Sequence, residues 1–219
     1  LMSFLDHITV VIINYNSEHI IAKSLEPLSS VAEIIIIDNA SSKKSVDYIR
    51  ENLPECRLIE NERNLGYGCG VNIGFKASKT KYTLVISPDS EINLEELKVL
   101  FSAAEQYKDA AVIAPSLIVP RIGREIWVMG ADELGHRRAD FDAAGPFCSW
   151  FVAGTVMFCP TERMLEIGGF DENIFLYMED LDLAMRITEA GYSMIYIPEI
   201  EARHLNSQSA PPSVKLHWL

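Results

Sequence analysis

The sequence predicts an α/β fold in which helices flank a mostly parallel sheet within a single domain. Two observations favour it: short β-branched apolar runs alternate with helical patterns in the first half, and no Gly-, Ser- or Pro-rich linker divides the 219 residues. Strand–helix units in series join parallel strands through right-handed crossovers. A chain of this length can bury about 70% of its unfolded surface, so one core suffices.

Four strands and four helices are predicted in the first half. Continuous apolar runs are typical of strands that helices cover on both faces, and these runs are residues 8–13, 34–37, 57–60 and 82–87. The helical segments are residues 17–28, 43–52, 67–78 and 94–107. The last of these has apolar residues at 94, 97, 100, 101 and 104, which is the spacing of one helical face.

The second half is less regular but continues without a linker. Its predicted strands are residues 111–115, 125–129 and 151–158, followed by a final pair at 194–197 and 200–204. Its predicted helices are residues 161–167 and 179–190, the second ended by Gly191. We therefore expect one domain spanning residues 1–219.

Composition excludes several classes of protein. The chain has 19 Lys+Arg against 31 Asp+Glu, a net charge of −12, which argues against nucleic-acid binding. The apolar run at 8–13 is too short to cross a bilayer, and no signal-peptide pattern precedes it. The cysteines show no C-x-x-C spacing, which favours free thiols in a reducing compartment, so we expect a cytoplasmic protein. They are Cys56, Cys69, Cys148 and Cys159.

Polar residues follow three of the predicted strands. Asn14 and Tyr15 end the first strand, Asp38 ends the second, and Asp89 follows the fourth. Ligands of open parallel sheets bind beyond the carboxyl ends of the strands. Asp and Asn are also common turn formers, which is the alternative for each residue alone. Two carboxylates at one edge of the sheet favour a site.

A glycine-rich stretch covers residues 64–74. It does not match the dinucleotide-binding pattern G-x-G-x-x-G, because Ile73 takes the sixth position counted from Gly68, and Val71 takes it counted from Gly66. The stretch also follows the third strand rather than the first. A dehydrogenase is therefore disfavoured, and close approach of a helix to the sheet or to a ligand explains the glycines.

The densest carboxylate cluster lies at residues 177–186. Glu179 and Asp180 fall at a helix start, where acidic residues favour the helix dipole, and Asp182 and Arg186 are spaced to pair on one helical face. The preceding loop can also deliver Glu179 and Asp180 to a cleft. His204 ends the last predicted strand, and it suits a metal site only if it faces Asp89.

In this order the motifs resemble the family-2 glycosyltransferases of GT-A fold, which is Rossmann-like, and within them the rhamnosyltransferase-like branch. The resemblance runs from the first strand to the tail. The matching stretches are residues 10–16, 35–41, 64–74 and 87–90, Gly154, residues 168–172 and 177–183, and His204.

The resemblance implies an enzyme of the hexosyltransferase class that inverts the anomeric carbon as it moves a sugar from a nucleoside-diphosphate donor to a hydroxyl acceptor. It implies a dTDP- or UDP-linked donor, a carbohydrate or lipid-linked acceptor, and a role in bacterial cell-surface polysaccharide or glycolipid synthesis. Residues up to about 110 would then bind the nucleotide, and residues from about 111 would bind the acceptor. A peripheral contact with the inner face of the membrane is compatible with this role.

The resemblance also assigns roles to residues. Asp180 would be the general base, with Glu179 beside it, and Asp89 and His204 would bind a divalent metal, Mg²⁺ or Mn²⁺. The family's D-x-D motif is reduced here to Ser87-Pro88-Asp89, which keeps only the final carboxylate. The donor-binding residues would be Asn14, Tyr15, Asp38, Asn64, Gly66, Asn72 and Asp89.

Two other functions are alternatives to a glycosyltransferase. The reduced D-x-D motif also suits a non-catalytic module that binds sugar nucleotides. A nucleotidyltransferase would need a basic glycine-rich loop after the first strand, and residues 14–18 contain no Gly, Lys or Arg. Acidic side chains in the cleft would repel a diphosphate unless a cation lies between them, so the charge predicts dependence on a divalent metal.

Overall fold

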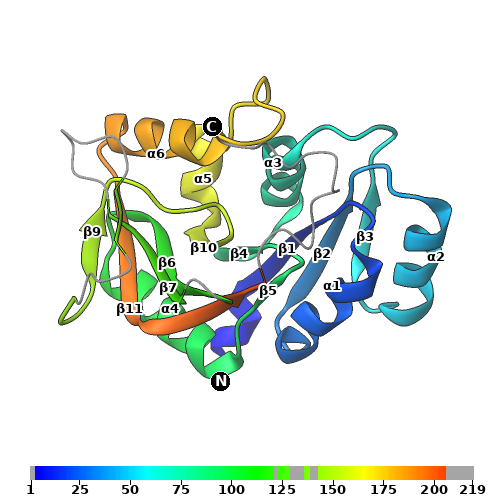
Figure 1. The fold of residues 1–219 in the computed structure, drawn as a ribbon, viewed down its shortest axis with the longest axis horizontal. Helices are drawn as coiled ribbons and strands as arrows, with labels where there is room; N and C mark the ends of the chain where they lie inside the picture. The colour runs from blue at the N-terminus through cyan, green and yellow to red at the C-terminus, as the bar shows by residue number, and fades with distance from the viewer. Residues whose placement is uncertain (1–2, 121–122, 129–135, 139–142, 206–219) are drawn as a thin grey trace.

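The computed structural model describes residues 3–120, 123–128, 136–138 and 143–205. Within these ranges eleven strands join one curled sheet, and six α-helices cover its two faces (Figure 1). The sheet runs through both halves of the sequence, which confirms the predicted α/β architecture. The main strand order is β3-β2-β1-β4-β10-β6-β11-β5.

The first half forms the parallel part of the sheet. Its strands β1 to β4 pair side by side in the order β3-β2-β1-β4, with Asn14 and Asp38 as register partners. The strands are β1 (Ile8–Asn14), β2 (Glu33–Asp38), β3 (Arg57–Glu60) and β4 (Tyr82–Ile86). The helices are α1 (Glu18–Leu25), α2 (Lys43–Asn52), α3 (Tyr67–Ala77) and α4 (Leu94–Gln106).

The second half extends the sheet with strands of both directions. β10 lies antiparallel to β4, and β6 and β11 follow as a parallel pair. β11 then pairs with the short strand β5, so the end of the described chain lies beside the segment after β4 (Figure 1). The elements are β5 (Ser90–Glu91), β6 (Ala110–Val119), β7 (Gly123–Val128), β8 (His136–Arg138), β9 (Phe147–Ser149), β10 (Val156–Pro160), α5 (Thr161–Ile167), α6 (Glu179–Glu189) and β11 (Ser193–His204).

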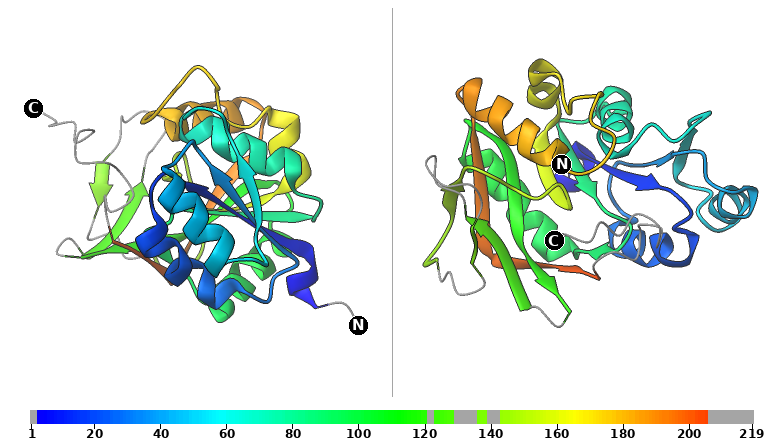
Figure 2. Two further views of the ribbon diagram at one scale, coloured as in Figure 1. Left: turned by 90° about the vertical axis from the view of Figure 1, so that its right-hand side faces the viewer. Right: turned by 45° about the horizontal axis from the view of Figure 1, so that its top comes forward.

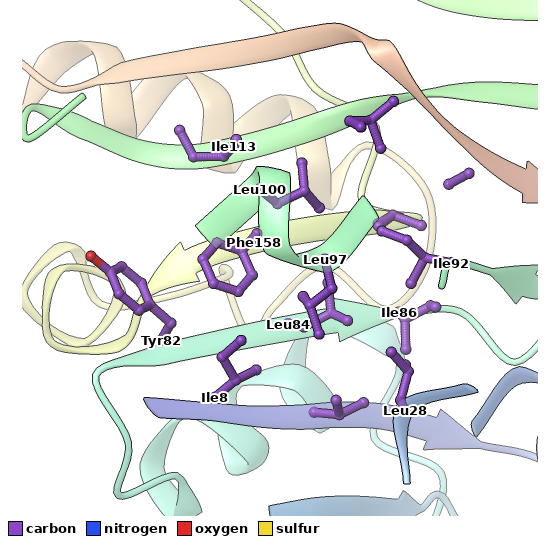
Figure 3. Close-up of a cluster of buried hydrophobic side chains, with 14 of the residues drawn as sticks. Ile8, Leu28, Tyr82, Leu84, Ile86, Ile92, Leu97, Leu100, Ile113 and Phe158 are labelled. Atoms are coloured by element: carbon purple, nitrogen blue, oxygen red, sulfur yellow. The ribbon is translucent and has the colours of Figure 1, made fainter. Parts of the chain in front are cut away.

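Alternate side chains of the strands enter two separate cores, because successive residues of a strand point to opposite faces. Ile8, Val10 and Ile12 of β1 join the core beneath α1, α2 and α4. Val11 and Ile13 join the core beneath α3, α5 and α6. Figure 3 shows the first core, where Leu97 and Leu100 of α4 lie over Leu84 and Phe158 of the sheet. Burial on both faces explains why the strands are apolar throughout.

Most predicted elements are confirmed within one or two residues. The strand predicted at 111–115 continues as β6 to Val119, and three further elements differ. The helix predicted to residue 28 ends as α1 at Leu25 and continues as a 3-10 turn, Glu26–Leu28, which contains Pro27. The final strand pair is one strand, β11, with a register shift between Ile197 and Glu201. Of the strand predicted at 125–129, residue 129 lies outside the described residues.

The third difference concerns the strand predicted at 151–158, which begins only at Val156. Residues 151–155 form a loop, and the backbone N–H of Gly154 donates to the Asp180 carboxylate rather than to a strand. An apolar run does not distinguish a strand from a buried loop, since Phe151 and Val152 are buried although they lie in the loop.

Two predictions from composition concern the cysteines and membrane helices. All four cysteines are free thiols, as expected, although only Cys159 is fully buried and Cys148 is exposed. Among the residues that the structure describes, no helix combines the length and the apolar character needed to cross a membrane.

Candidate active site

Asn14 and Asp38 form a buried pair at the carboxyl ends of β1 and β2. The Asn14 amide donates to Asp38 Oδ1 at 2.6 Å, and the Ser41 backbone N–H donates to Asp38 Oδ2 at 2.9 Å. The two side chains are 0% and 1% exposed. The pair fixes the loop after β2, while Tyr15 follows it as a partly buried residue. That Asn14, Tyr15 and Asp38 contact a nucleotide stays a prediction from the sequence.

Asn64 and Gly66 shape the entry to α3. Asn64 Oδ1 accepts the Gly66 N–H at 2.9 Å, and the next N–H, of Tyr67, donates to the carbonyl oxygen of Phe175 at 3.1 Å. Gly66 has φ +90°, and a Cβ there would lie 2.2 Å from the Phe175 oxygen. A glycine is therefore required where the start of α3 meets the loop before α6.

Asn72 holds the same loop from the middle of α3. Its Oδ1 accepts the Phe170 N–H at 2.8 Å, and its Nδ2 donates to the Phe170 carbonyl at 2.9 Å. The side chain is 3% exposed. Figures 1 and 2 show the gold segment between α5 and α6 beside the teal helix α3. These bonds make Asn72 an anchor of that loop, and its predicted role in donor binding stays a prediction.

Glu179 and Asp180 occupy the first turn of α6. The two residues before them, Tyr177 and Met178, have φ +65° and +72°, the left-handed conformation that ordinary residues rarely adopt. Asp180 Oδ2 accepts the Gly154 N–H at 3.3 Å, and Oδ1 accepts the Leu181 N–H at 2.9 Å. Burial raises the pKa of Asp180 above its usual value in spite of these bonds.

Glu179 is the less exposed of the two residues. It is 7% exposed, and its Oε2 has no hydrogen-bond partner among the described residues. Burial, with the charge of Asp180 as a further cause, raises the pKa of Glu179 to about 7. Two adjacent carboxyl groups with raised pKa values are typical of a site that accepts or donates protons near neutral pH.

Tyr67 lies against both carboxyl groups and was not among the predicted site residues. Its hydroxyl donates to the Gly154 carbonyl. Burial, followed by the charges of Glu179 and Asp180, raises the pKa of Tyr67, so the phenol stays protonated. The sequence placed Tyr67 only at the start of a helix. Its partners lie far along the chain, so no local pattern could have identified it.

Asp89 and His204 meet just beyond the carboxyl end of β4. β5 pairs with β11 so that His204 is opposite Ser90, and the Leu205 N–H donates to the Asp89 carbonyl at 2.8 Å. His204 Nε2 then lies 3.6 Å from Asp89 Oδ1, and Asp89 is 2% exposed. The sequence made the metal role of His204 conditional on its facing Asp89, and the structure meets this condition.

The donor atoms of this pair fit a divalent cation. A carboxylate oxygen with an imidazole nitrogen suits Mn²⁺ or Mg²⁺. No group of three or more His, Cys, Asp or Glu residues that could hold a metal occurs in the described part of the chain. Two protein ligands leave several coordination positions, and these suit the oxygens of a diphosphate and water.

The segments that carry Asp89 and Asp180 are joined through the ends of β4 and β10. The Ser87 N–H donates to the Thr155 carbonyl at 2.9 Å, next to Gly154. Ser87 also hydrogen-bonds to Tyr67, which opposes the rise in the pKa of that phenol. This hydrogen bond joins the segment that carries Asp89 to the loop whose Gly154 contacts Asp180. Farther along α6, Asp182 and Arg186 form the predicted ion pair at 2.6 Å.

Comparison with protein families gives two matches that overlap and together cover most of the chain. The model of Glycosyl transferase family 2 matches residues 9–148. The model of Glycosyl transferase family group 2 matches residues 82–216. Both matched ranges contain Asp89, and the second contains Asp180 and His204.

Three curated relatives are each 24% identical to this chain. They are an N-acetylglucosaminyl-diphospho-decaprenol L-rhamnosyltransferase of Mycobacterium tuberculosis, the low-salt glycan biosynthesis hexosyltransferase Agl10 of Haloferax volcanii and the rhamnosyltransferase WbbL of Escherichia coli K12. The alignments cover 93%, 92% and 89% of this chain and 78%, 68% and 82% of the respective relatives.

Solved structures share the fold. GalNAc-T7 with UDP, GalNAc and Mn²⁺ matches with a TM-score of 0.72 and 19% identity over 90% of this chain. The mannosyltransferase PcManGT of Pyrobaculum calidifontis, with GDP-Man and Mn²⁺, matches with a TM-score of 0.65 and 15% identity over 94% of it. The chain spans 43% and 57% of those chains. These likenesses confirm the GT-A fold.

Proposed function

The chain belongs to glycosyl transferase family 2, and from that premise we propose that it moves a sugar from a nucleoside-diphosphate donor to an acceptor hydroxyl with inversion at the anomeric carbon. One observation carries the proposal: Asp180 accepts the Gly154 N–H, and the carbonyl of the next residue, Thr155, accepts the N–H of Ser87 in the segment that holds Asp89. A candidate base and a candidate cation site thus share one end of the sheet.

Asp180 is the proposed general base. Its carboxylate is fixed by two backbone N–H groups, and burial raises its pKa, which increases its affinity for the proton of an attacking hydroxyl. The acceptor oxygen attacks the anomeric carbon as its proton passes to Asp180, and the bond to the diphosphate breaks. A single displacement of this kind inverts the anomeric centre.

Asp89 and His204 are the proposed protein ligands of Mg²⁺ or Mn²⁺. The bound cation supplies Lewis-acid neutralisation of the charge that develops on the leaving diphosphate. Asp89 provides a buried carboxylate oxygen, and His204 provides Nε2 at 3.6 Å from it. With only these two ligands from the described chain, binding of metal and of nucleotide should depend on each other.

The donor is proposed to lie along the ends of β1, β2 and α3. Tyr15 is the partly buried residue there that can stack on a base, while the Asn14–Asp38 pair fixes the loop beneath it. Asn64, Gly66 and Asn72 then line or hold the wall formed by α3. In this arrangement residues 1–110 bind the nucleotide, and residues 111–219 bind the acceptor and contain the base, Asp180.

The relatives suggest the substrates. Two of the three are named rhamnosyltransferases, and the mycobacterial protein is named for an N-acetylglucosaminyl-diphospho-decaprenol acceptor. We therefore propose a dTDP- or UDP-linked sugar as donor and a carbohydrate, most directly a lipid-linked one, as acceptor. Such an acceptor would place the protein in cell-surface polysaccharide or glycolipid synthesis, at the cytoplasmic face of a membrane.

The test is a turnover assay with Mn²⁺ or Mg²⁺ and a panel of dTDP-, UDP- and GDP-linked sugars. Transfer of one sugar to a diphosphate-linked acceptor, with loss of turnover in EDTA and inversion seen by NMR of the product, is the expected result. A protein that binds a sugar nucleotide but releases no nucleoside diphosphate, not even by slow hydrolysis, would instead be a non-catalytic binding module.

A further inference from the structure

The hydroxyl of Tyr67 connects three segments around the candidate base. Tyr67 is the first residue of α3, and its phenol donates to the carbonyl oxygen of Gly154. Its ring lies edge-on to that of Phe170, with 6.0 Å between the centroids. The loop that carries Gly154 is itself bonded to the end of β4, since the Ser87 N–H donates to the Thr155 carbonyl at 2.9 Å. Tyr67 is therefore held on its ring and on its hydroxyl, which makes it a fixed point within the site.

Gly154 connects Tyr67 to Asp180 through two hydrogen bonds. Its carbonyl accepts from Tyr67, and its N–H donates to Asp180 Oδ2 at 3.3 Å. A Cβ on Gly154 would lie 3.4 Å from the Tyr67 ring and 3.6 Å from Asp180 Cβ, so the residue lies between the two side chains. A glycine backbone rotates freely on its own. The bond from Tyr67 restricts that rotation and keeps the N–H aimed at the carboxylate.

We infer that Tyr67 is a positioning residue that acts through Gly154 to set the orientation and proton affinity of Asp180. This inference rests on the proposed role of Asp180 as the general base. Tyr67 itself touches no reacting atom. Its hydroxyl stabilises the backbone conformation in which the Gly154 N–H favours the ionised carboxylate.

The charge environment gives this bond a measurable effect. Burial raises the pKa of Asp180, and the hydrogen bond from the Gly154 N–H lowers it. The titratable groups that interact with this network are Glu179 on α6, Tyr67 on α3 and Cys159 on β10. Tyr67→Phe removes only the phenol hydroxyl and leaves the side chains of Glu179 and Cys159 in place. A change in the pKa of Asp180 in this variant would therefore report the loss of the Gly154 contact.

The test compares Tyr67→Phe with Tyr82→Phe. Tyr82 is also a buried tyrosine, but its hydroxyl donates to Glu105 at 2.6 Å, at the opposite end of β4. We expect Tyr67→Phe to raise the pKa of Asp180 in a ¹³C-carboxyl NMR titration, with the resonance assigned by its absence in Asp180→Asn. Tyr82→Phe should leave it unchanged. This readout needs no substrate.

Kinetics provide the second readout. With the sugar nucleotide that is turned over, Tyr67→Phe should lower kcat about tenfold, the worth of one aligned hydrogen bond to a charged site. The acidic limb of the pH–kcat profile should move to higher pH, while the KM for the donor stays unchanged.

An unchanged Asp180 titration in folded Tyr67→Phe would overturn the inference, and so would a loss of thermal stability without a pH shift. Failure of the proposed function looks different: the wild type would then show no turnover, or Asp180→Asn would keep it, whatever the Asp180 titration in Tyr67→Phe shows.

Discussion

His204 Nε2 lies 3.6 Å from Asp89 Oδ1, although the two residues are 115 positions apart in the sequence. The pairing of β11 with β5 creates this contact, because it places His204 opposite Ser90, the neighbour of Asp89. The long strand β11 thus carries the end of the described chain to the reduced D-x-D segment. This contact puts an imidazole nitrogen beside the one carboxylate that the motif keeps.

Replacing His204 by Ala should weaken the Mn²⁺-dependent binding of UDP or dTDP at least about tenfold, which is about 1.4 kcal/mol. Two described side chains offer ligands, so the loss of one removes half of the protein's share of the coordination. Isothermal titration calorimetry of the nucleotide, with and without Mn²⁺, measures the effect. His19→Ala, at an exposed position on α1, is the control. Equal affinity of His204→Ala and wild type in Mn²⁺ would exclude the role of His204.

Asp180→Asn should abolish sugar transfer, with a loss in kcat of about 10²- to 10⁴-fold, the usual contribution of general base catalysis. The amide keeps the shape of the carboxylate but cannot take a proton. Nucleotide binding in Mn²⁺ should be nearly unchanged, since Asp89 and His204 are intact. Glu189→Gln, at the exposed last turn of the same helix, is the matched control. Near-normal turnover of Asp180→Asn would show that the base is another group.

The raised pKa of Glu179 predicts that the free energy of unfolding depends on pH. Its pKa is raised from 4.5 to about 7, so the folded state binds more protons than the unfolded state between these values. The free energy of unfolding therefore falls as pH rises through this window, by up to roughly 3 kcal/mol at about 1.4 kcal/mol per pKa unit.

Glu179→Gln should remove this fall, so that its stability exceeds that of the wild type at pH 8 but not at pH 4. Urea unfolding at both pH values measures the difference, with Glu189→Gln as the control. Parallel pH profiles for Glu179→Gln and the wild type would contradict the raised pKa.

Gly66→Ala should cost more stability than Gly168→Ala, by about 2 kcal/mol or more. Both glycines have φ near +90°, but Gly66 has ψ 172°, a conformation almost limited to glycine, whereas Gly168 has ψ 7°, near the left-handed helical region. Only at Gly66 would the new Cβ also collide with a backbone atom, the Phe175 oxygen at 2.2 Å, whereas nothing lies within 4 Å at Gly168. Thermal unfolding of the two variants tests the difference. Equal melting temperatures would mean that the loop before α6 moves away from the new Cβ without a loss of stability.

The sequence predicted the parallel half of the fold closely because its signals are local. Buried strands such as β1 read as continuous apolar runs, and α4 begins at a capping box formed by Asn93 and Glu96. The loop at residues 151–155 was wrongly predicted as strand, because its apolar residues are buried for tertiary reasons. The one strand β11 was predicted as two, since the register shift after Ile197 depends on its partner β6.

By itself, the sequence determined the α/β fold class, the strand ends that carry Asp38 and Asp89, and the helix start that carries Glu179 and Asp180. Apolar periodicity and turn residues encode these features over a few neighbouring positions. Only the tertiary structure decided that His204 meets Asp89 and that Tyr67 reaches Asp180 through Gly154. These contacts arise from the pairing of β11 with β5 and from the packing of α3 against the loop before α6. Such long-range placements follow from the packing of the whole chain and leave no mark in any single stretch of sequence.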